Sequence, residues 1–152
     1  MNSFSRSLPA VVLALCLSAC STFDRDWQQA QATASKDSFS GAWEGRWKST
    51  KHRAADGRLR AILSRVDARS YRARFQAQWL AFTSTYALTL EAQLRGETLI
   101  FRGSHDLGAL FGGKYRYEGT AARGDFRAIY DSRYDQGAFT MSRRLTKPAS
   151  IP

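Results

Sequence analysis

The chain has 152 residues, a formal net charge of +10, two cysteines and two histidines. Its length suits one domain. Hydrophobic residues make up 43% of the chain, which is enough to build a core and excludes a wholly disordered chain. Two cysteines exclude a disulfide-rich scaffold and a zinc site with four thiolates. The positive charge by itself suggests a nucleic acid or an anionic surface as partner.

Residues 1–19 have the pattern of an export signal. Arg6 precedes an apolar run from Leu8 to Ala19, which as a helix would span about 18 Å. Because that is well short of the roughly 30 Å hydrocarbon core of a bilayer, the run predicts a signal peptide rather than a membrane span. It ends in Leu17-Ser18-Ala19-Cys20, which resembles the lipobox of bacterial lipoproteins.

The lipobox resemblance implies a lipid anchor on Cys20: diacylglycerol on its thiol, cleavage before it and acylation of the new amino group. Ser21 rather than Asp follows, which in Gram-negative bacteria implies sorting to the outer membrane, and we expect the domain to face the periplasm. Buried acyl chains contribute about 0.8 kcal/mol per CH₂, so more than one chain anchors stably. Cys16 would leave with the signal. The alternative is a secretory signal in which Cys20 occurs by chance.

Residues 20–38, which follow the signal, are polar, with Gln28, Gln29 and Gln31 among alanines. We interpret them as a flexible tether between the lipid anchor and the domain. The alternative is a short helix that is capped by Asp24 or Asp26 and runs to about residue 34.

From residue 39 onward, apolar and polar residues alternate with a period of two, as in strands with one buried face. Gly, Asp and Arg-rich turn signals separate the runs. The pattern predicts an all-β domain over residues 39–147, an eight-stranded antiparallel up-and-down barrel, because closure removes exposed edge strands. A two-sheet sandwich is the alternative. The expected strands cover residues 41–51, 58–67, 71–79, 86–94, 99–103, 115–119, 126–130 and 139–145.

The two ends of this region resemble lipocalins and their calycin relatives. Gly41-Ala42-Trp43 is similar to their Gly-x-Trp entry motif, and Arg143 lies on the apolar parity of the last strand. The resemblance implies a lipocalin-like barrel in which the Arg143 guanidinium packs over the Trp43 ring, a contact of about 0.5 to 2 kcal/mol. The opening Trp43-Glu44-Gly45-Arg46-Trp47 also resembles that of uncharacterised envelope lipoproteins, which implies no activity.

The inward parity of the predicted strands carries many aromatic residues. An eight-stranded interior is either filled by side chains or wide enough for one small ligand, and small residues such as Ala73, Ala77 and Gly103 leave the second state open. The apolar, glycine-rich loop Asp106–Gly113 is a plug, a mobile lid or a partner surface. The candidate ligand-lining residues are Tyr71, Phe75, Trp79, Tyr86, Phe101, Tyr115, Tyr117 and Tyr130.

The sequence contains no convergent acid–base set, so we expect no enzyme and no catalytic residue. His52 lies in a predicted basic turn, where a solvated side chain is expected. A catalytic triad needs the three residue types that follow one another at Ser104, His105 and Asp106. Because neighbouring residues on an extended chain point to opposite faces, these three side chains cannot converge on one another. An axial haem ligand at a barrel mouth is the alternative for His105. We expect no cofactor, and no metal because two lone histidines cannot cage zinc.

Most of the positively charged residues fall on the outward-facing positions of the predicted strands. The aromatic residues lie on the opposite face, so no stacking platform forms, and we expect no nucleic acid as partner. We expect a membrane partner through Cys20, with a basic wall that faces anionic lipid or an acidic envelope protein. A merely solvated wall is the alternative. The sequence thus predicts an outer-membrane lipoprotein whose barrel binds a small apolar ligand, or a non-catalytic structural or partner-binding one. The outward arginines are Arg72, Arg74, Arg102, Arg116 and Arg127.

Overall fold

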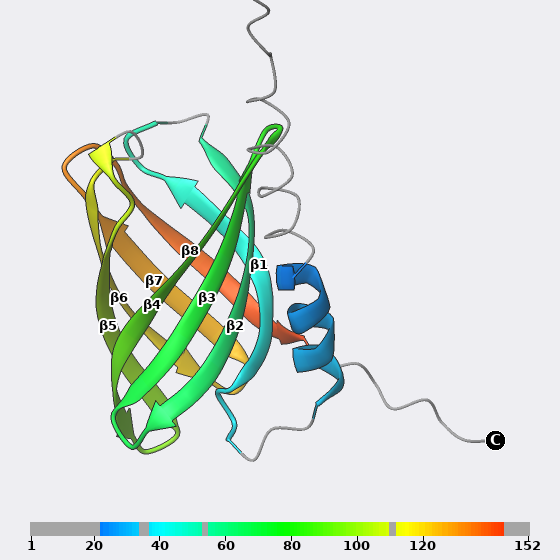
Figure 1. Ribbon diagram of the computed structural model, residues 1–152. Coiled ribbons are helices and arrows are strands. Elements are labelled where there is room, and N and C mark those ends of the chain that lie inside the picture. The colour runs from blue at the N-terminus through cyan, green and yellow to red at the C-terminus, as the bar shows by residue number, and fades with distance from the viewer. Residues whose placement is uncertain (1–21, 34–36, 53–54, 110–111, 145–152) are drawn as a thin grey trace, which may run out of the picture.

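The computed structural model describes residues 22–33, 37–52, 55–109 and 112–144. Each strand pairs antiparallel with the next, and the last pairs with the first, so the sheet closes into a barrel (Figure 1). The expected eight-stranded up-and-down barrel is confirmed, and the sandwich is excluded. The strands are β1 (Gly41–Ser49), β2 (Asp56–Asp67), β3 (Ser70–Trp79), β4 (Phe82–Arg95), β5 (Thr98–Asp106), β6 (Lys114–Ala122), β7 (Asp125–Asp131) and β8 (Gln136–Arg144).

The barrel has two different ends. The connections β1–β2, β3–β4, β5–β6 and β7–β8 lie at one end, which we call the mouth; it is uppermost in Figure 1. The other three connections lie at the opposite end, together with Phe39, which is buried in the core. We call this second end the closed end.

The predicted alternation sets the inside and outside of the wall. On β3, Tyr71, Ala73 and Phe75 are buried, whereas Arg72 is exposed. Inside, the rings of Phe101 and Phe126 have centroids 4.5 Å apart, and the rings of Trp43 and Phe126 have centroids 5.7 Å apart. Close ring packing of this kind fills the interior from the closed end to the middle of the barrel.

Small inward residues do not leave a void in this packing. A methyl group added to Gly103 would lie 2.8 Å from Cδ1 of Leu88 and 2.9 Å from Cδ2 of Leu90. The leucines of β4 thus occupy the space that Gly103 leaves open. For this part of the barrel, the filled interior is the correct one of the two expected states.

The closed end is fastened differently from the lipocalin expectation. Trp43 and Arg143 are direct partners across the β1–β8 seam. However, the Arg143 guanidinium donates to the carbonyl oxygens of Ser38 and, at 2.6 Å, Ser40. Among the described residues, the cation–π contacts are made by Arg60, Arg74 and Arg133. No such contact joins Arg143 to the Trp43 ring among these residues; Arg143 ties the segment before β1 across the end.

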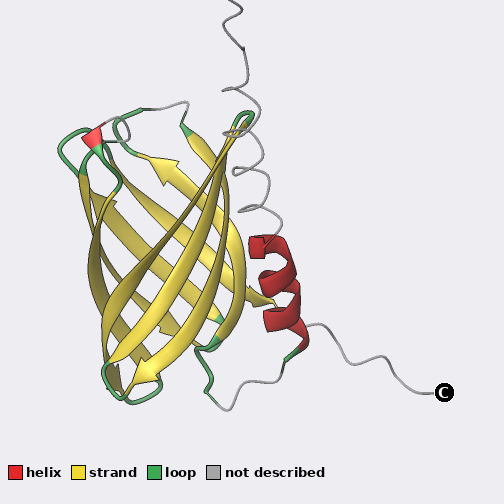
Figure 2. Ribbon diagram, viewed as in Figure 1, coloured by secondary structure: helices red, strands yellow, loops and turns green. Residues whose placement is uncertain are grey.

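A helix over residues 22–32 packs on the outside of the barrel (Figure 2). Phe23 and Trp27 are buried against Ala42 of β1 and Ile62 of β2. The flexible-tether interpretation is therefore wrong for residues 22–32. The short-helix alternative is right about the element, although Asp24 and Asp26 lie within it and do not cap it. In the described part of the chain, no helix has both the length and the apolar character needed to cross a membrane.

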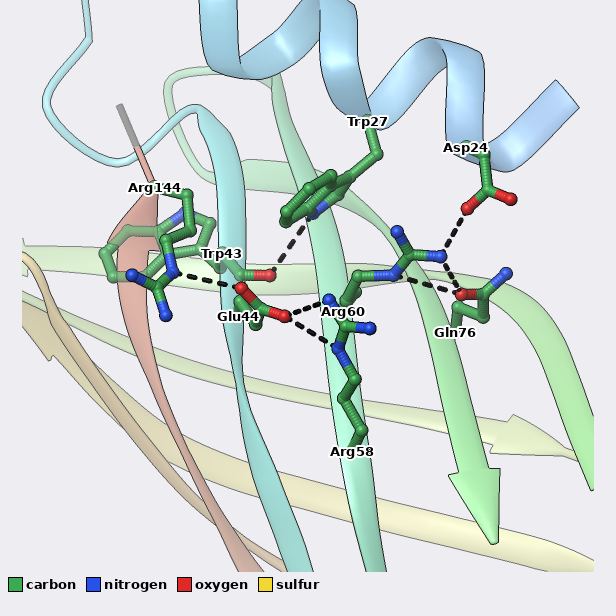
Figure 3. Close-up of polar contacts among 8 residues, drawn as sticks. All are labelled: Asp24, Trp27, Trp43, Glu44, Arg58, Arg60, Gln76 and Arg144. Carbon is green, nitrogen blue, oxygen red and sulfur yellow. Dashed lines mark hydrogen bonds and ion pairs between the residues drawn. The ribbon is translucent and has the colours of Figure 1, made fainter. Parts of the chain in front are cut away.

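Polar contacts fix this helix to β2 and β3 (Figure 3). Arg60 of β2 pairs with Asp24 and Gln76, and its guanidinium lies 4.9 Å from the centroid of the Trp27 ring. Arg74 of β3 forms an ion pair with Asp26 at 2.7 Å. Arg60 and Arg74 therefore bind the helix rather than an external anion.

Glu44 joins the seam on the outer face of β1. Its carboxylate pairs with Arg58 of β2 and, at 3.0 Å, with Arg144 of β8, and its side chain is only 18% exposed. Figure 3 shows the two arginines converging on it from neighbouring strands. Farther round the wall, Arg102 and Arg116 pair with Glu91 and Asp131 in the same way. Much of the predicted basic wall is thus internally neutralised.

Candidate functional site

The interior changes character toward the mouth. Phenylalanine and aliphatic side chains give way to four tyrosines and a histidine, which we call the tyrosine cluster: Tyr86 of β4, His105 of β5, Tyr115 and Tyr117 of β6, and Tyr130 of β7. Successive ring centroids in the cluster lie 5.8 to 6.5 Å apart. The inward parity of four strands therefore brings polar aromatic groups together at one end.

Two of the tyrosine hydroxyls are held by each other, since Tyr86 and Tyr117 are hydrogen-bonded partners. A third is held by a carboxylate, because the Tyr130 hydroxyl donates to Asp135 Oδ2 at 3.1 Å. Asp135 lies in the β7–β8 connection, and its other oxygen accepts from the Ser49 hydroxyl at 2.5 Å. These bonds make a rigid polar floor beneath the mouth.

The electrostatics of this floor keep the phenols neutral. Burial, which disfavours the phenolate, raises the pKa of Tyr86 to about 12. Burial and then the neighbouring Tyr86 raise the pKa of Tyr117, and burial followed by the Asp135 charge raises that of Tyr130. Tyr86, Tyr117 and Tyr130 therefore keep uncharged hydroxyl groups across the physiological pH range.

Tyr115 and His105 complete the cluster but differ from its other members. Among the described residues, neither the Tyr115 hydroxyl nor a ring nitrogen of His105 has a hydrogen-bond partner. The His105 ring stacks on Tyr86 at 5.8 Å with an interplanar angle of 16°. These two side chains thus present unused polar atoms at the inner surface of the mouth.

The β5–β6 connection lies directly over Tyr115. A methyl group added to Gly112, whose φ is +94°, would lie 2.6 Å from the Tyr115 hydroxyl oxygen. The loop is closed by its own backbone bonds, from Leu107 N to Gly113 O at 3.0 Å and from Gly113 N to Gly108 O at 2.9 Å. The glycine-rich sequence is thus needed for a compact turn that touches the cluster; its residues 110–111 lie outside the described residues.

The predicted ligand-lining residues do not form one group. Tyr86, Tyr115, Tyr117 and Tyr130 meet at the mouth, as described above. Tyr71, Phe75 and Phe101 are buried in the filled part of the core, and the hydroxyl of Tyr71 pairs with Asp37 at the closed end. Trp79 is 45% exposed at the tip of the β3–β4 hairpin, outside the barrel.

Sequence reasoning placed His105 at a barrel mouth only as an alternative haem ligand and did not count it among the lining residues, and it missed Asp135 as a hydroxyl acceptor. The signal for His105 was present, because it continues the inward parity of Leu99, Phe101 and Gly103. Its neighbours Ser104 and Asp106 are exposed, so the three side chains do not converge. Among the described residues, no group of three or more His, Cys, Asp or Glu side chains is placed to hold a metal ion. The candidate lipidation site Cys20 and residues 1–19 lie outside the described residues.

Two hollows on the described part of the chain lie outside the barrel. One, of about 1120 Å³, follows the outer face of β4 to β7. Its lining includes Ile100 and Ile129, which are 38% and 59% exposed, with Arg102 and Glu118 beside them. The other, of about 590 Å³, lies where the helix meets β2. The first hollow is the larger apolar feature of the outer wall.

No protein-family model and no curated protein matches the chain. Two solved structures are similar to it, both crystal structures of mutants of the fluorescent protein UnaG. They have TM-scores of 0.40 and 0.37 and sequence identities of 14% and 13%. Each similarity covers 72% of this chain and 97% of the other.

Proposed function

We propose that the protein is a lipid-anchored envelope protein that binds a small ligand at the tyrosine-lined mouth of its barrel. The observation that carries the proposal is the pair of unused polar groups on Tyr115 and His105 at the edge of a packed aromatic wall. A ligand that fits has a planar apolar body, which stacks on the rings, and a polar end that bonds the Tyr115 hydroxyl. The filled core below the cluster restricts such a ligand to the mouth.

The anchor is the part of the proposal that rests on sequence alone. The apolar run before Cys20 and the box Leu17-Ser18-Ala19-Cys20 support cleavage and acylation at Cys20. Ser21 supports delivery to the outer membrane. Globomycin-sensitive processing, together with the mass of the mature N-terminal peptide, tests this part directly. A mature peptide without acyl chains would remove the anchor from the proposal.

A binding role rather than catalysis is supported by the chemistry of the mouth. Tyr86, Tyr117 and Tyr130 are held neutral by burial. The histidine of the tyrosine cluster, His105, lies against a phenol ring rather than beside a nucleophile or a carboxylate. Stacking and neutral hydrogen bonds hold a ligand without activating it.

The experiment is a titration of the purified full-length protein with anilinonaphthalene sulfonate, whose rings and sulfonate match the inferred ligand. We expect saturable fluorescence, and Tyr115→Phe should weaken binding by about 1 kcal/mol, roughly fivefold in Kd, since one hydrogen bond is lost. Tyr71→Phe is the matched control, because it removes a hydroxyl from the closed end. Equal effects of the two substitutions, or no saturable binding, would reject the mouth as a ligand site.

A protein partner is the second candidate, and the outer groove favours it. Ile129 is 59% exposed in a groove flanked by charged side chains, and exposed apolar area of this kind marks interaction surfaces. Native electrophoresis of detergent-solubilised envelopes tests it: Ile129→Arg should dissolve a complex that Tyr134→Arg leaves intact, because Tyr134 is an exposed aromatic residue outside the groove lining. Migration of the wild type as a monomer would remove this candidate.

A further inference from the structure

The β3–β4 hairpin carries a strongly apolar tip that projects beyond the mouth (Figure 1). Its four residues read Trp79-Leu80-Ala81-Phe82, and Leu80 and Phe82 are 84% and 71% exposed. The rings of Trp79 and Phe82 stack on each other at 6.4 Å rather than on the core. Trp, Leu and Phe are the side chains that amphipathic membrane-binding elements place in the bilayer interface.

The backbone conformation of the tip disfavours a large side chain at its first turn residue. Leu80 is the first residue of a two-residue turn between the paired residues Trp79 and Phe82, and its φ is +52°. Gly, Asn and Asp occupy such positions at low cost, whereas a bulky side chain there is strained. A large apolar residue at this position is unfavourable for the turn and leaves its side chain in water, so the turn itself does not explain it.

The end of the barrel that carries the tip also carries unpaired positive charge. Lys48, Lys51 and Lys114 are exposed at the mouth and are the lysines of the described residues. None of them forms an ion pair with a described carboxylate. Basic side chains around an apolar tip are complementary to a surface of anionic lipid headgroups.

One of these lysines follows a residue that contacts the hairpin. The Trp47 indole N–H donates to the Gln78 carbonyl at 3.1 Å, which joins the end of β1 to the base of the hairpin, and Lys48 is the next residue of the chain. Lys51 lies farther round the mouth, where its Nζ donates to the Arg133 carbonyl oxygen in the β7–β8 connection at 3.4 Å. The lysines are therefore spread around the same mouth that carries the apolar tip.

The docked helix limits how far the proposed anchor lies from the barrel wall. Phe23 lies against Arg74, five residues before Trp79 on β3, whereas Ala30 lies against Gly41 at the closed end. The helix thus runs from the middle of the barrel toward the closed end (Figure 1). Only Ser21 separates Cys20 from Thr22, so the chain between them reaches at most about 7 Å. An acylated Cys20 would hold the barrel against the bilayer rather than at a distance from it.

We infer that the Trp79–Phe82 tip inserts into the interfacial layer of an anionic phospholipid bilayer, so that the mouth faces the membrane. The inference rests on the proposed function in one respect, the acylation of Cys20, and it adds an orientation that acylation alone does not fix. It also makes the bilayer the route by which an apolar ligand reaches the tyrosine cluster.

The test uses two cysteine variants of the full chain, Ala81→Cys in the tip and Ala68→Cys in the β2–β3 turn at the closed end. Both alanines are exposed and lie in two-residue turns, so they form a matched pair. Each cysteine is labelled with nitrobenzoxadiazole, and the protein is placed on vesicles of phosphatidylethanolamine and phosphatidylglycerol. We expect a blue shift and quenching by spin-labelled lipid at position 81 and neither at position 68.

Substitution of Leu80 then separates insertion from mere proximity. Leu80→Asp keeps a residue that accepts positive φ, so the turn is retained, and it should abolish the blue shift at position 81. Val66→Asp, at an exposed apolar site near the closed end, should leave that shift unchanged. Vesicles of phosphatidylcholine alone should give a smaller shift, because the lysines lose their anionic partners.

Three outcomes would overturn the inference: equal emission from positions 81 and 68, a shift that survives Leu80→Asp, or a shift that depends on protein concentration without vesicles. The last would mean that a second copy covers the tip. Acylation is read from the mass of the same sample. If acyl chains are absent, the proposed anchor fails, and the two labels are read again in a Cys16→Ser, Cys20→Ser background, where the tip alone decides the result.

Discussion

The guanidinium of Arg60 lies 4.9 Å from the centroid of the Trp27 ring, over the face of an indole that comes from the helix outside the barrel. The same guanidinium pairs with Asp24 one turn earlier on the helix. One outward arginine of β2 therefore holds two side chains of residues 22–32. This contact makes the segment after the proposed anchor a fixed part of the domain.

Replacement of Trp27 with alanine is expected to release the helix and leave the barrel folded. Trp27 is 7% exposed, and loss of a large buried aromatic side chain costs about 3 kcal/mol or more. Hydrogen exchange should show loss of protection over residues 22–32 and unchanged protection in β1 to β8. Gln28→Ala, at an exposed position of the same helix, is the control. Cooperative loss of protection in the strands would contradict a separable helix.

The strands could be predicted from the sequence because each one shows its buried face directly. Tyr71, Ala73 and Phe75 alternate with arginines, and the structure buries the first set and exposes the second, apart from Arg74 beneath the helix. Periodicity says which side of the wall a residue faces, but it does not say where the barrel ends. Trp79 has inward parity and still lies outside, since the β3–β4 hairpin continues past the mouth.

The helix and the seam were harder to predict. Phe23, Trp27 and Ala30 have helical spacing, but polar residues surround them, and their partner is an outward surface that alternation assigns to solvent. The position of Arg143 opposite Trp43 could be predicted from parity and motif. The direction of its guanidinium could not, because the carbonyl groups it binds belong to a segment without a repeating pattern.

Gly45 is expected to tolerate no side chain. A methyl group there would lie 2.7 Å from the Met141 Cα and closer still to the Thr140 carbonyl oxygen, both on the backbone of β8. Because the backbone of β8 cannot move away without opening the β1–β8 seam, Gly45→Ala should destabilise the protein by about 3 kcal/mol or prevent folding. Ser142→Ala, at an exposed site on β8, should change the denaturation midpoint little. A Gly45→Ala midpoint equal to that of the control would show that the seam opens without cost.

Alkaline pH is expected to unfold the barrel through its buried tyrosines. The folded pKa of Tyr86 is raised by burial from 10.0 to about 12, so above pH 10 the unfolded chain binds fewer protons than the folded one. The free energy of unfolding is therefore unaffected by this group below pH 10 and falls as the pH rises toward 12. Urea unfolding and tyrosinate absorbance, followed together, should show ionisation of the buried phenols coinciding with unfolding.

Tyr130 offers a check on the origin of this pH dependence. Burial raises its pKa first, and the Asp135 charge adds to the effect. Tyr130→Phe removes one titrating group and should make the loss of stability above pH 10 less steep. Tyrosine ionisation completed near pH 10 with the fold intact would show that the cluster is open to water.

Arg143 and Arg144 are adjacent on β8 and differ in what they hold, so they form a matched pair for the closed end. The Arg143 guanidinium donates to the Ser38 and Ser40 carbonyl groups, whereas Arg144 is 54% exposed and pairs with Glu44, which Arg58 also neutralises. Arg143→Met removes two charge-assisted hydrogen bonds, to the exposed Ser38 and the half-buried Ser40 carbonyl groups, and should cost about 2 kcal/mol in urea unfolding. Arg144→Met should cost less than about 1 kcal/mol, as expected for an exposed ion pair. Because Arg143 reaches the segment before β1, its loss should also expose Phe39 and speed exchange of the Phe39 amide. Equal costs for the two substitutions would mean that the end is closed by Phe39 packing alone.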